Sequence, residues 1–237
     1  MVQYFLMDLS IRMFTTLMKY KKIINMYRIA FFGGTGGLGS KVIEHLNDYE
    51  VISVGSSNVD LSDSKQIKSF VEQNDFDILV IFSNYNYNSF LHKYSDSLTE
   101  LTKQIDINIK GNTQLISESL KKMRDKKWGR IIIASSVTVD KPIMGTGVYA
   151  SCKAFFENLV KTIAIENASK NITANCIQLG YMDGGLLYTL PEDFLEKIKL
   201  EIPSKRIGSI EEIYKTLDFI INNEYINGKT IKLTGGL

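Results

Sequence analysis

Apolar and polar positions along the chain follow two different rhythms. Short apolar runs, rich in β-branched residues, predict six strands, at residues 28–32, 51–54, 78–82, 130–134, 173–177 and 230–233. Between them, apolar residues recur every three or four positions and predict helices at residues 38–46, 64–73, 98–122, 148–167 and 210–222. A helix that joins two parallel strands must pack back onto their sheet. The pattern therefore predicts the α/β class: a single-domain, Rossmann-type, doubly wound parallel sheet with helices on both faces.

The first 25 residues form a separate segment. Apolar side chains recur there at helical spacing, at Leu6, Leu9, Met13, Leu17, Tyr20 and Ile24. Asp8 and Arg12 interrupt the apolar stretch, which argues against a secretory signal peptide. Residues 1–25 are therefore either an amphipathic N-terminal extension that docks on a partner or a membrane surface, or a non-functional leader before a start at Met26. Residues 26–237 form the globular domain.

Composition narrows the possible partners of this domain. The chain has 237 residues, of which 44% are hydrophobic and 23% charged, as in ordinary globular proteins without a transmembrane segment. Its 28 basic and 26 acidic residues are spread along the whole length, which argues against a nucleic-acid surface. Cys152 and Cys176 lack the spacing of a disulfide framework or a metal site, so we expect no metal and a cytoplasmic location.

Five glycines fall within ten residues, FFGGTGGLGS at positions 31–40, directly after the first apolar run. Gly33, Gly37 and Gly39 lie where the predicted strand turns into a helix. A tight turn, a close approach to a pyrophosphate and close helix packing each exclude a Cβ at such positions. The start of the helix adds unpaired N–H groups and a favourable dipole for phosphate oxygens. The segment therefore predicts a dinucleotide site.

Three further motifs follow the glycine loop in order. Asn108 stands in NIKG, Ser136 in IIIASSV, and Tyr149 and Lys153 in YASCK, thirteen residues after the serine. With the glycine loop, they make residues 28–237 resemble the short-chain dehydrogenase/reductase (SDR) family, and the spacing is most like that of 3-oxoacyl-ACP reductases.

The resemblance implies an NAD(P)-dependent enzyme that interconverts a ketone and a secondary alcohol by hydride transfer. It implies the catalytic set Ser136, Tyr149, Lys153 and Asn108, and a homotetramer built through the predicted helices at 98–122 and 148–167. It also implies a set of cofactor-binding residues: Gly33, Thr35, Gly36, Gly37, Leu38, Gly39, Ser56, Ser57, Asp60, Leu61, Ser83, Asn84, Tyr149, Lys153, Gly180 and Met182.

The chemistry of the catalytic set can be argued from the side chains themselves. A phenol titrates near pH 10, so it needs a neighbour that stabilises phenolate before it can exchange protons at neutral pH. Lys153, four residues after Tyr149 on a helix, is expected to lower that pKa and to hold the cofactor ribose. Ser136 would hydrogen-bond the substrate oxygen, and Asn108 would link Lys153 through water to a proton supply.

Each of these side chains also has an ordinary structural interpretation. Tyr149 and Lys153 could be an amphipathic helix pair, Ser136 a cap or turn hydroxyl, and Asn108 a buried side chain bonded to backbone. The segment SNYNYN, at residues 83–88, is either a substrate loop or an irregular surface turn.

Cofactor preference depends on the end of the second predicted strand. NAD-binding sites usually place a carboxylate there, whereas this chain has Gly55, Ser56 and Ser57. The hydroxyls tolerate a 2′-phosphate, so we expect NADP(H) to be favoured over NAD(H). Asp60 and Leu61 resemble the adenine-contacting pair of the family, although an aspartate here could equally cap the following helix.

Two stretches depart from the family pattern. The motif NNAG is replaced by Ile81, Phe82, Ser83 and Asn84, and PGxxxT is replaced by residues 179–184. Asp183 could take over as an acceptor for the carboxamide of the cofactor. The losses motivate an alternative in which the chain is a non-catalytic NADP(H)-sensing or scaffold protein.

The substrate is the least determined part of the assignment. Lys127 and Lys170 fall where 3-oxoacyl-ACP reductases carry basic residues that meet the acidic carrier protein, but both could be ordinary solvated charges. The segment at residues 186–201, with Leu187, Tyr188, Leu190 and Phe194, could cover an acyl chain, a sugar or a small ketone. A sugar or small-ketone reductase of the same family is therefore the alternative enzyme.

Overall fold

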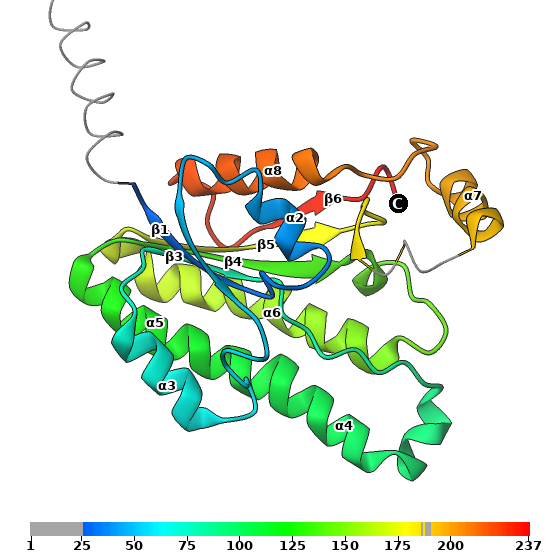
Figure 1. Cartoon of the computed structure of the whole chain (residues 1–237), viewed down its shortest axis with the longest axis horizontal. Coiled ribbons are helices and arrows are strands. Elements are labelled where there is room, and N and C mark those ends of the chain that lie inside the picture. Colours follow the sequence, from blue (N-terminus) through cyan, green and yellow to red (C-terminus); the bar gives the residue numbers. More distant parts are fainter. Residues whose placement is uncertain (1–25, 186, 188–190) are drawn as a thin grey trace, which may run out of the picture.

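The computed structural model describes residues 26–185, 187 and 191–237, so the predicted extension at 1–25 lies outside the described residues. Six parallel strands form one sheet in the order β2-β1-β3-β4-β5-β6 (Figure 1). Their bounds are β1 Arg28–Phe32, β2 Glu50–Val54, β3 Ile78–Ile81, β4 Gly129–Ser136, β5 Ile172–Leu179 and β6 Thr230–Leu233. Both the α/β class and the doubly wound, Rossmann-type parallel sheet are confirmed.

Helices cover both faces of the sheet (Figure 1). On one face, α2 (Gly39–Ile43) and α8 (Ile210–Asn222) pack against apolar side chains such as Phe31 and Val80. On the other, α3 (Ser64–Gln73), α5 (Asn112–Lys126) and α6 (Gly147–Asn167) pack against the alternate set, which includes Phe32 and Leu79. Successive strand residues point to opposite faces, so strands buried on both sides read as the continuous apolar runs seen in the sequence.

The helix predicted over residues 38–46 is shorter and ends at Ile43 in α2, and two further helical segments differ from the sequence prediction. The helix expected over residues 98–122 is α4 (Leu98–Ile105), a π-helical segment (Asp106–Gly111) and then α5. A Cβ at Gly111 would collide with the carbonyl oxygen of Leu61, so the chain packs its bare backbone there. The segment at 186–201 contains α7 (Glu192–Glu201), beyond the carboxyl ends of the strands (Figure 1). In it, residues 186 and 188–190 lie outside the described part.

The strand order places a topological switch point beside β1. The chain passes from β1 to β2 on one side and then to β3 on the other, and β1 is bonded to both. In sheets of this kind, a crevice opens at the carboxyl ends of the two strands that flank the switch. Gly33 follows β1 and Phe82 follows β3, so the glycine loop lies at this crevice. Among the described residues, no helix has the length and apolar character needed to span a membrane.

Candidate active site

Three glycines of the loop at residues 33–39 are packed so closely that a side chain at any of them would crowd the neighbouring backbone. Gly33 has φ +87°, and a Cβ there would lie 2.6 Å from the backbone nitrogen of Ser83. A Cβ at Gly37 would lie 3.2 Å from the Cα of Gly185, and one at Gly39 would collide with the Gly33 carbonyl oxygen. The loop therefore needs glycine for close backbone packing as well as for approach by a ligand.

Two cavities meet over this loop and share Gly33, Gly36, Phe82 and Asn84 in their walls. One, of about 330 Å³, extends towards the ends of β1 and β2, and the other, of about 710 Å³, extends towards β4, β5 and α6. We call them the β2 cavity and the α6 cavity. All but one of the predicted cofactor residues lie in their walls. The exception is the exposed Ser57, which is not among the described residues that line either cavity.

The β2 cavity contains the predicted pair Asp60 and Leu61, together with Thr35 and Ser56. The Asp60 carboxylate accepts hydrogen bonds from the backbone N–H of Ser62 (2.8 Å) and from its hydroxyl (2.7 Å). Asp60 therefore closes a local turn, and the cap of α3 is Asp63 instead, which accepts from two backbone N–H groups of that helix. The capping alternative for Asp60 is wrong.

The residues that replace the NNAG motif keep the sheet intact at the shared wall. The backbone N–H groups of Phe82 and Ser83 donate to the Phe32 carbonyl at 2.7 and 3.0 Å. The Ser83 hydroxyl bonds to Asn112 at 3.3 Å. Asn84 contributes a buried side-chain oxygen, Oδ1, that has no hydrogen-bond partner among the described residues. A buried, unsatisfied acceptor between two cavities is typical of a place where a ligand or water donates a hydrogen bond.

Ser136 is the last residue of β4 and the N-cap of a short 3₁₀ segment, Val137–Val139. Its Oγ accepts hydrogen bonds from the backbone N–H of Thr138 (3.2 Å) and from the Thr138 hydroxyl (2.9 Å). Both lone pairs are thus used, and the hydroxyl proton remains available for donation. The capping role and a role towards substrate are therefore compatible, because they use different parts of one hydroxyl.

Tyr149 lies in the first turn of α6, in the wall of the α6 cavity with Ser136. Burial raises the pKa of Tyr149 above its usual value of 10, while a hydrogen bond with the Ser136 side chain lowers it by a smaller amount. On balance the pKa of Tyr149 is therefore raised and not lowered as expected, because the burial of the phenol outweighs the effect of Ser136. A phenol with a raised pKa stays protonated at neutral pH and is suited to give up a proton to a stronger base.

Lys153 is buried one helical turn later. Its ammonium donates a hydrogen bond to the Ala134 carbonyl (2.9 Å) and lies over the Tyr149 ring, 5.7 Å from the centroid. Burial lowers the pKa of Lys153 to about 8, and the nearby Cys176 and Cys152 raise it by smaller amounts. The two side chains therefore share one face of α6, as the four-residue spacing predicts.

Asn108 lies in the π-helical segment and bonds to the backbone of another loop. Its Oδ1 accepts from the Tyr85 N–H and its Nδ2 donates to the Tyr85 carbonyl, both at 2.7 Å. The structural alternative, a buried amide bonded to backbone, describes this side chain. Asn108 and Lys153 also line one small cavity of about 10 Å³, at the lower limit for a single water molecule.

The loop after β5 adds Gly180 and Met182 to the same cavity wall, next to Ser136, whose register partner in β5 is Leu179. It is held by residues 206–209: the Gly208 N–H donates to the Tyr181 carbonyl at 2.9 Å, and the Asp183 N–H donates to the Gly208 carbonyl at 2.7 Å. Asp183 lines a separate cavity of about 380 Å³ with Leu187.

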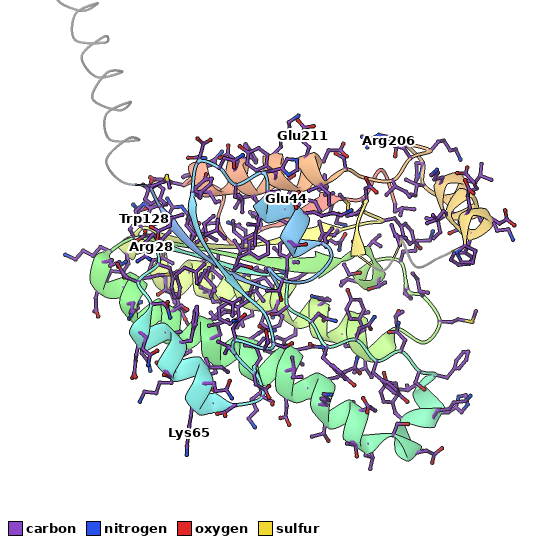
Figure 2. The ribbon with its side chains drawn as sticks, in the orientation of Figure 1. Arg28, Glu44, Lys65, Trp128, Arg206 and Glu211 are labelled. Carbon is purple, nitrogen blue, oxygen red and sulfur yellow. The ribbon has the colours of Figure 1, made fainter. Side chains whose placement is uncertain are left out.

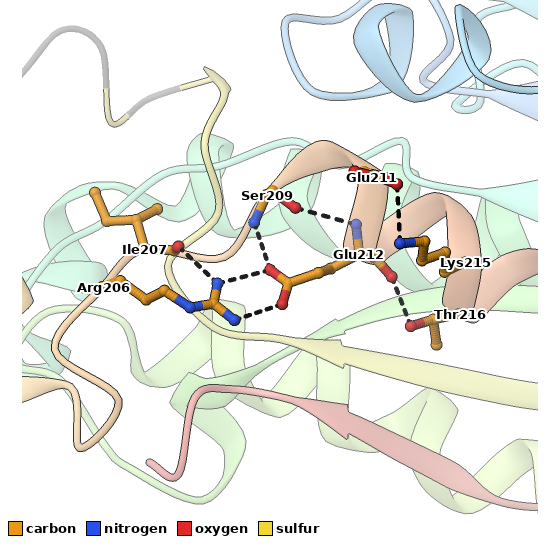
Figure 3. Close-up of polar contacts among 7 residues, drawn as sticks. All are labelled: Arg206, Ile207, Ser209, Glu211, Glu212, Lys215 and Thr216. Carbon is orange, nitrogen blue, oxygen red and sulfur yellow. Dashed lines mark hydrogen bonds and ion pairs between the residues drawn. The ribbon is translucent and has the colours of Figure 1, made fainter.

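A clamp that the sequence prediction missed fixes residues 206–209 (Figure 3). The Arg206 guanidinium makes two hydrogen bonds with the Glu212 carboxylate, at 2.9 and 2.6 Å. Glu212 also accepts from the Ser209 N–H (2.8 Å), and the Ser209 hydroxyl accepts from the Glu212 N–H (3.2 Å), which forms a capping box at the start of α8. Serine followed three residues later by glutamate is the signal that could have found it.

Lys127 and Lys170 lie far from the two cavities. They lie two residues before β4 and β5, whose first residues pair at the amino edge of the sheet, whereas Ser136 ends β4 at the other edge. Seven steps along a strand span about 23 Å. Figure 2 shows Trp128 at this amino end and Arg206 at the opposite end of the molecule. A carrier protein bound at these two lysines would therefore lie far from this chain's own cleft.

Fold and site together define an NAD(P)-dependent oxidoreductase with a Rossmann-type sheet. The chain belongs to the short-chain dehydrogenase/reductase family: residues 39–237 match the family model described as Enoyl-(Acyl carrier protein) reductase. A solved structure described as a small-chain dehydrogenase in complex with NADPH superposes with a TM-score of 0.77 at 21% identity, covering 90% of this chain and 98% of that one. This likeness shows the fold.

Similar proteins of known name are reductases. The 3-oxoacyl-[acyl-carrier-protein] reductase FabG of Rickettsia prowazekii (strain Madrid E) is 29% identical over 212 residues, 84% of this chain and 87% of that protein. FabG of Aquifex aeolicus (strain VF5) is also 29% identical, over 86% and 85% of the two chains. The acetoacetyl-CoA reductase of Shinella zoogloeoides is 32% identical over 163 residues, 68% of this chain and 67% of that protein.

Proposed function

We propose that the chain reduces the ketone of a 3-oxoacyl thioester to a secondary alcohol with NADPH, and that Tyr149 is the proton donor. The observation that carries the proposal is that Ser136, Tyr149 and Lys153 line one cavity, which adjoins the glycine loop. The similarity to proteins named 3-oxoacyl-ACP reductase and acetoacetyl-CoA reductase supports the substrate class.

The residues present fit a dinucleotide. Gly33 and Gly37 leave room only for bare backbone, the two cavities join over the loop, and Asn84 offers an unsatisfied buried acceptor between them. When bound, the nicotinamide cofactor supplies hydride donation to the carbonyl carbon. Ser56 and Asp60 would hold its adenosine half, and Lys153 would hold the ribose near Tyr149.

The chain's own groups handle the oxygen and the proton. With substrate bound, the O–H of Ser136 would turn from Tyr149 to the ketone oxygen, where negative charge develops as the carbonyl carbon is reduced. Tyr149 transfers its phenolic proton to that oxygen, which completes the alcohol and leaves a phenolate. The ammonium of Lys153 stabilises this phenolate, and a water in the small cavity shared with Asn108 returns a proton.

We propose NADP(H) as the favoured cofactor. The first residues after β2 are Gly55 and Ser56, which carry no charge that would repel a 2′-phosphate, and Ser56 lines the β2 cavity. Calorimetric titration with NADPH and NADH measures the preference directly. At least tenfold tighter binding of NADPH, about 1.4 kcal/mol, is the expected result.

NADPH oxidation in the presence of acetoacetyl-CoA tests the activity. Tyr149→Phe should lower kcat by roughly 10²- to 10⁴-fold and leave NADPH affinity within a few-fold, because it removes one oxygen from the cavity wall. Tight NADPH binding with no turnover of any ketone, or equal rates for the two enzymes, would instead favour the NADP(H)-sensing protein. Turnover confined to hydroxylated ketones would favour the sugar reductase.

We also propose the homotetramer implied by the family resemblance. Large apolar side chains on α4 and α6 are exposed, among them Leu98 and Ile105 on α4 and Phe155 and Ile165 on α6. Burial of such a surface between copies would remove it from water. Light scattering of the full chain should give four times the mass of one chain, and a monomeric mass would exclude this assembly.

A cytoplasmic location is proposed on separate grounds. Cys152 and Cys176 are both free and buried, as expected of a protein from a reducing compartment. Cell fractionation with a cytoplasmic marker tests this assignment.

A further inference from the structure

The segment NYNYN, residues 84–88, turns its tyrosines and asparagines to different sides. Tyr85 donates a short hydrogen bond to Glu100 of α4, and the Lys103 ammonium lies 4.3 Å from the centroid of the Tyr85 ring. Tyr87 donates to the Ser97 hydroxyl at 3.1 Å, at the start of the same helix. Both aromatic side chains therefore anchor the segment on α4. A period of two is typical of an extended chain.

The backbone of the segment is fixed as firmly as its tyrosines. Asn108 bonds to both the N–H and the carbonyl of Tyr85. The Tyr87 carbonyl accepts from Gln104 Nε2 at 3.0 Å and from the Tyr94 hydroxyl at 2.9 Å. Gln104 and Tyr94 are both buried. The segment has no regular secondary structure, but these hydrogen bonds hold its backbone in place.

The asparagines between these anchors line the α6 cavity. Asn86 and Asn88 are exposed, stand in the same cavity wall as Ser136 and Tyr149, and form no hydrogen bond with any residue that the structure describes. Each carboxamide offers two donors and an acceptor. Within the described part of the chain, the only charged side chain in this wall is that of Lys153. The wall therefore suits a neutral ligand group that both donates and accepts hydrogen bonds.

We infer that Asn86 and Asn88 bind the amide-bearing arm of a thioester substrate and so determine specificity. The inference rests on the proposed function, because the ketone must lie at Ser136 and Tyr149 for the rest of the substrate to reach this wall. The N–H of the arm's amide can donate to one carboxamide oxygen and its carbonyl oxygen can accept from the other carboxamide, and the tyrosine anchors hold both asparagines in place beforehand. A free 3-oxo acid, which is anionic, finds no second cation among the described residues of the wall.

Three substrates with the same ketone test the inference: acetoacetyl-CoA, the N-acetylcysteamine thioester of acetoacetate, and the ethyl thioester of acetoacetate, which has no amide. Asn86→Leu, Asn88→Leu and the double variant replace each carboxamide by an apolar group of similar size. Asn47→Leu, at an exposed position outside both cavities, is the matched control. Thermal unfolding and NADPH affinity are measured for every variant.

The double variant should lose about tenfold in kcat/KM on both amide-bearing substrates and keep its rate on the ethyl thioester. The control should match the parent enzyme on all three. Equal losses on the three substrates, or no loss on any, would overturn the specificity role while the proposed function stands. A parent enzyme that reduces none of them would overturn the proposed function itself, and this inference with it.

Discussion

The ammonium of Lys153 lies over the ring of Tyr149, 5.7 Å from the centroid, and donates its hydrogen bond to the carbonyl of Ala134 at 2.9 Å. Burial shifts the two groups in opposite directions, raising the pKa of the phenol and lowering that of the ammonium to about 8. Both shifts favour the uncharged form. The phenol is therefore protonated at neutral pH, which is the form that the proposed reduction requires.

Ser136→Ala is expected to lower kcat for reduction by roughly 10²- to 10³-fold, as for the loss of one donor to a developing oxyanion. The substitution also removes the hydrogen bond that lowers the pKa of Tyr149. In the direction of alcohol oxidation, which needs the phenolate, the rise of kcat/KM with pH should move to higher pH. Thr138→Val, which deletes one donor to Ser136 but keeps the serine hydroxyl, should cost less than tenfold. An unshifted profile in Ser136→Ala would refute the contact.

Lys153→Met should abolish activity and raise the free energy of unfolding. The folded pKa of about 8 is below the unfolded value near 10.4, so the unfolded chain binds more protons between these pH values. Stability of the parent protein should therefore increase from pH 8 to about pH 10.4 as the penalty for the buried charge disappears. At pH 7 the substitution removes that penalty, a gain of up to about 3 kcal/mol before the lost bond to Ala134 is counted. Urea unfolding at pH 7 and 10 measures both effects, and a destabilised variant at pH 7 would contradict the assignment.

Gly33→Ala should destabilise the fold by about 1–3 kcal/mol and weaken NADPH binding. The alanine would have to adopt φ +87° with its Cβ 2.6 Å from the Ser83 nitrogen. Gly147→Ala is the matched control, because a Cβ there meets nothing within 4 Å and the residue begins α6. It should leave stability unchanged or raise it by up to about 1 kcal/mol. Similar losses in the two variants would mean that the loop is not specially packed.

Much of the fold follows from the pattern of apolar residues. The predicted strands at 28–32 and 230–233 and the helices at 64–73 and 210–222 coincide with β1, β6, α3 and α8. Strands β4 and β5 extend beyond the predicted bounds at both ends, in part because glycine, serine and glutamine there carry little β signal. The helix α7 was recognised only as a covering segment, although Pro191 followed by Glu192 and Asp193 is a helix-start signal.

The sequence predicts which residues form the site but does not predict their hydrogen bonds. Motif order brought Ser136, Tyr149 and Lys153 to one cavity, as the structure has them. The sequence pattern could not show that the Asn108 amide makes two hydrogen bonds with the backbone of Tyr85. The two residues are 23 positions apart, and a π-helical segment brings Asn108 to Tyr85. The raised pKa of Tyr149 was equally hidden, because burial is a property of packing. Local sequence patterns predict which residues line the site, whereas the pKa values of those residues depend on contacts with distant parts of the chain.

The Arg206–Glu212 clamp lines neither the β2 cavity nor the α6 cavity, but it should stabilise the loop after β5, which contributes to the wall of the α6 cavity. Glu212→Gln removes the carboxylate that bonds to Arg206 and to the Ser209 N–H, and residues 206–209 hold the loop that carries Gly180 and Met182. We expect weaker NADPH binding and a lower Tm at pH 7. Arg206 and the backbone of Ser209 lower the pKa of Glu212 to about 2, so its contribution is present above the unfolded value near 4.3 and is lost as pH falls from there towards 2.

The difference in Tm between the parent and Glu212→Gln should therefore shrink as pH is lowered through this range. Glu211→Gln is a close control, because Glu211 precedes Glu212 in the same turn and pairs with Lys215 instead (Figure 3). An exposed pair of this kind contributes little, so that variant should keep both NADPH affinity and Tm. Equal effects of the two substitutions on NADPH binding would show that charge at the start of α8, and not the clamp, acts on the loop.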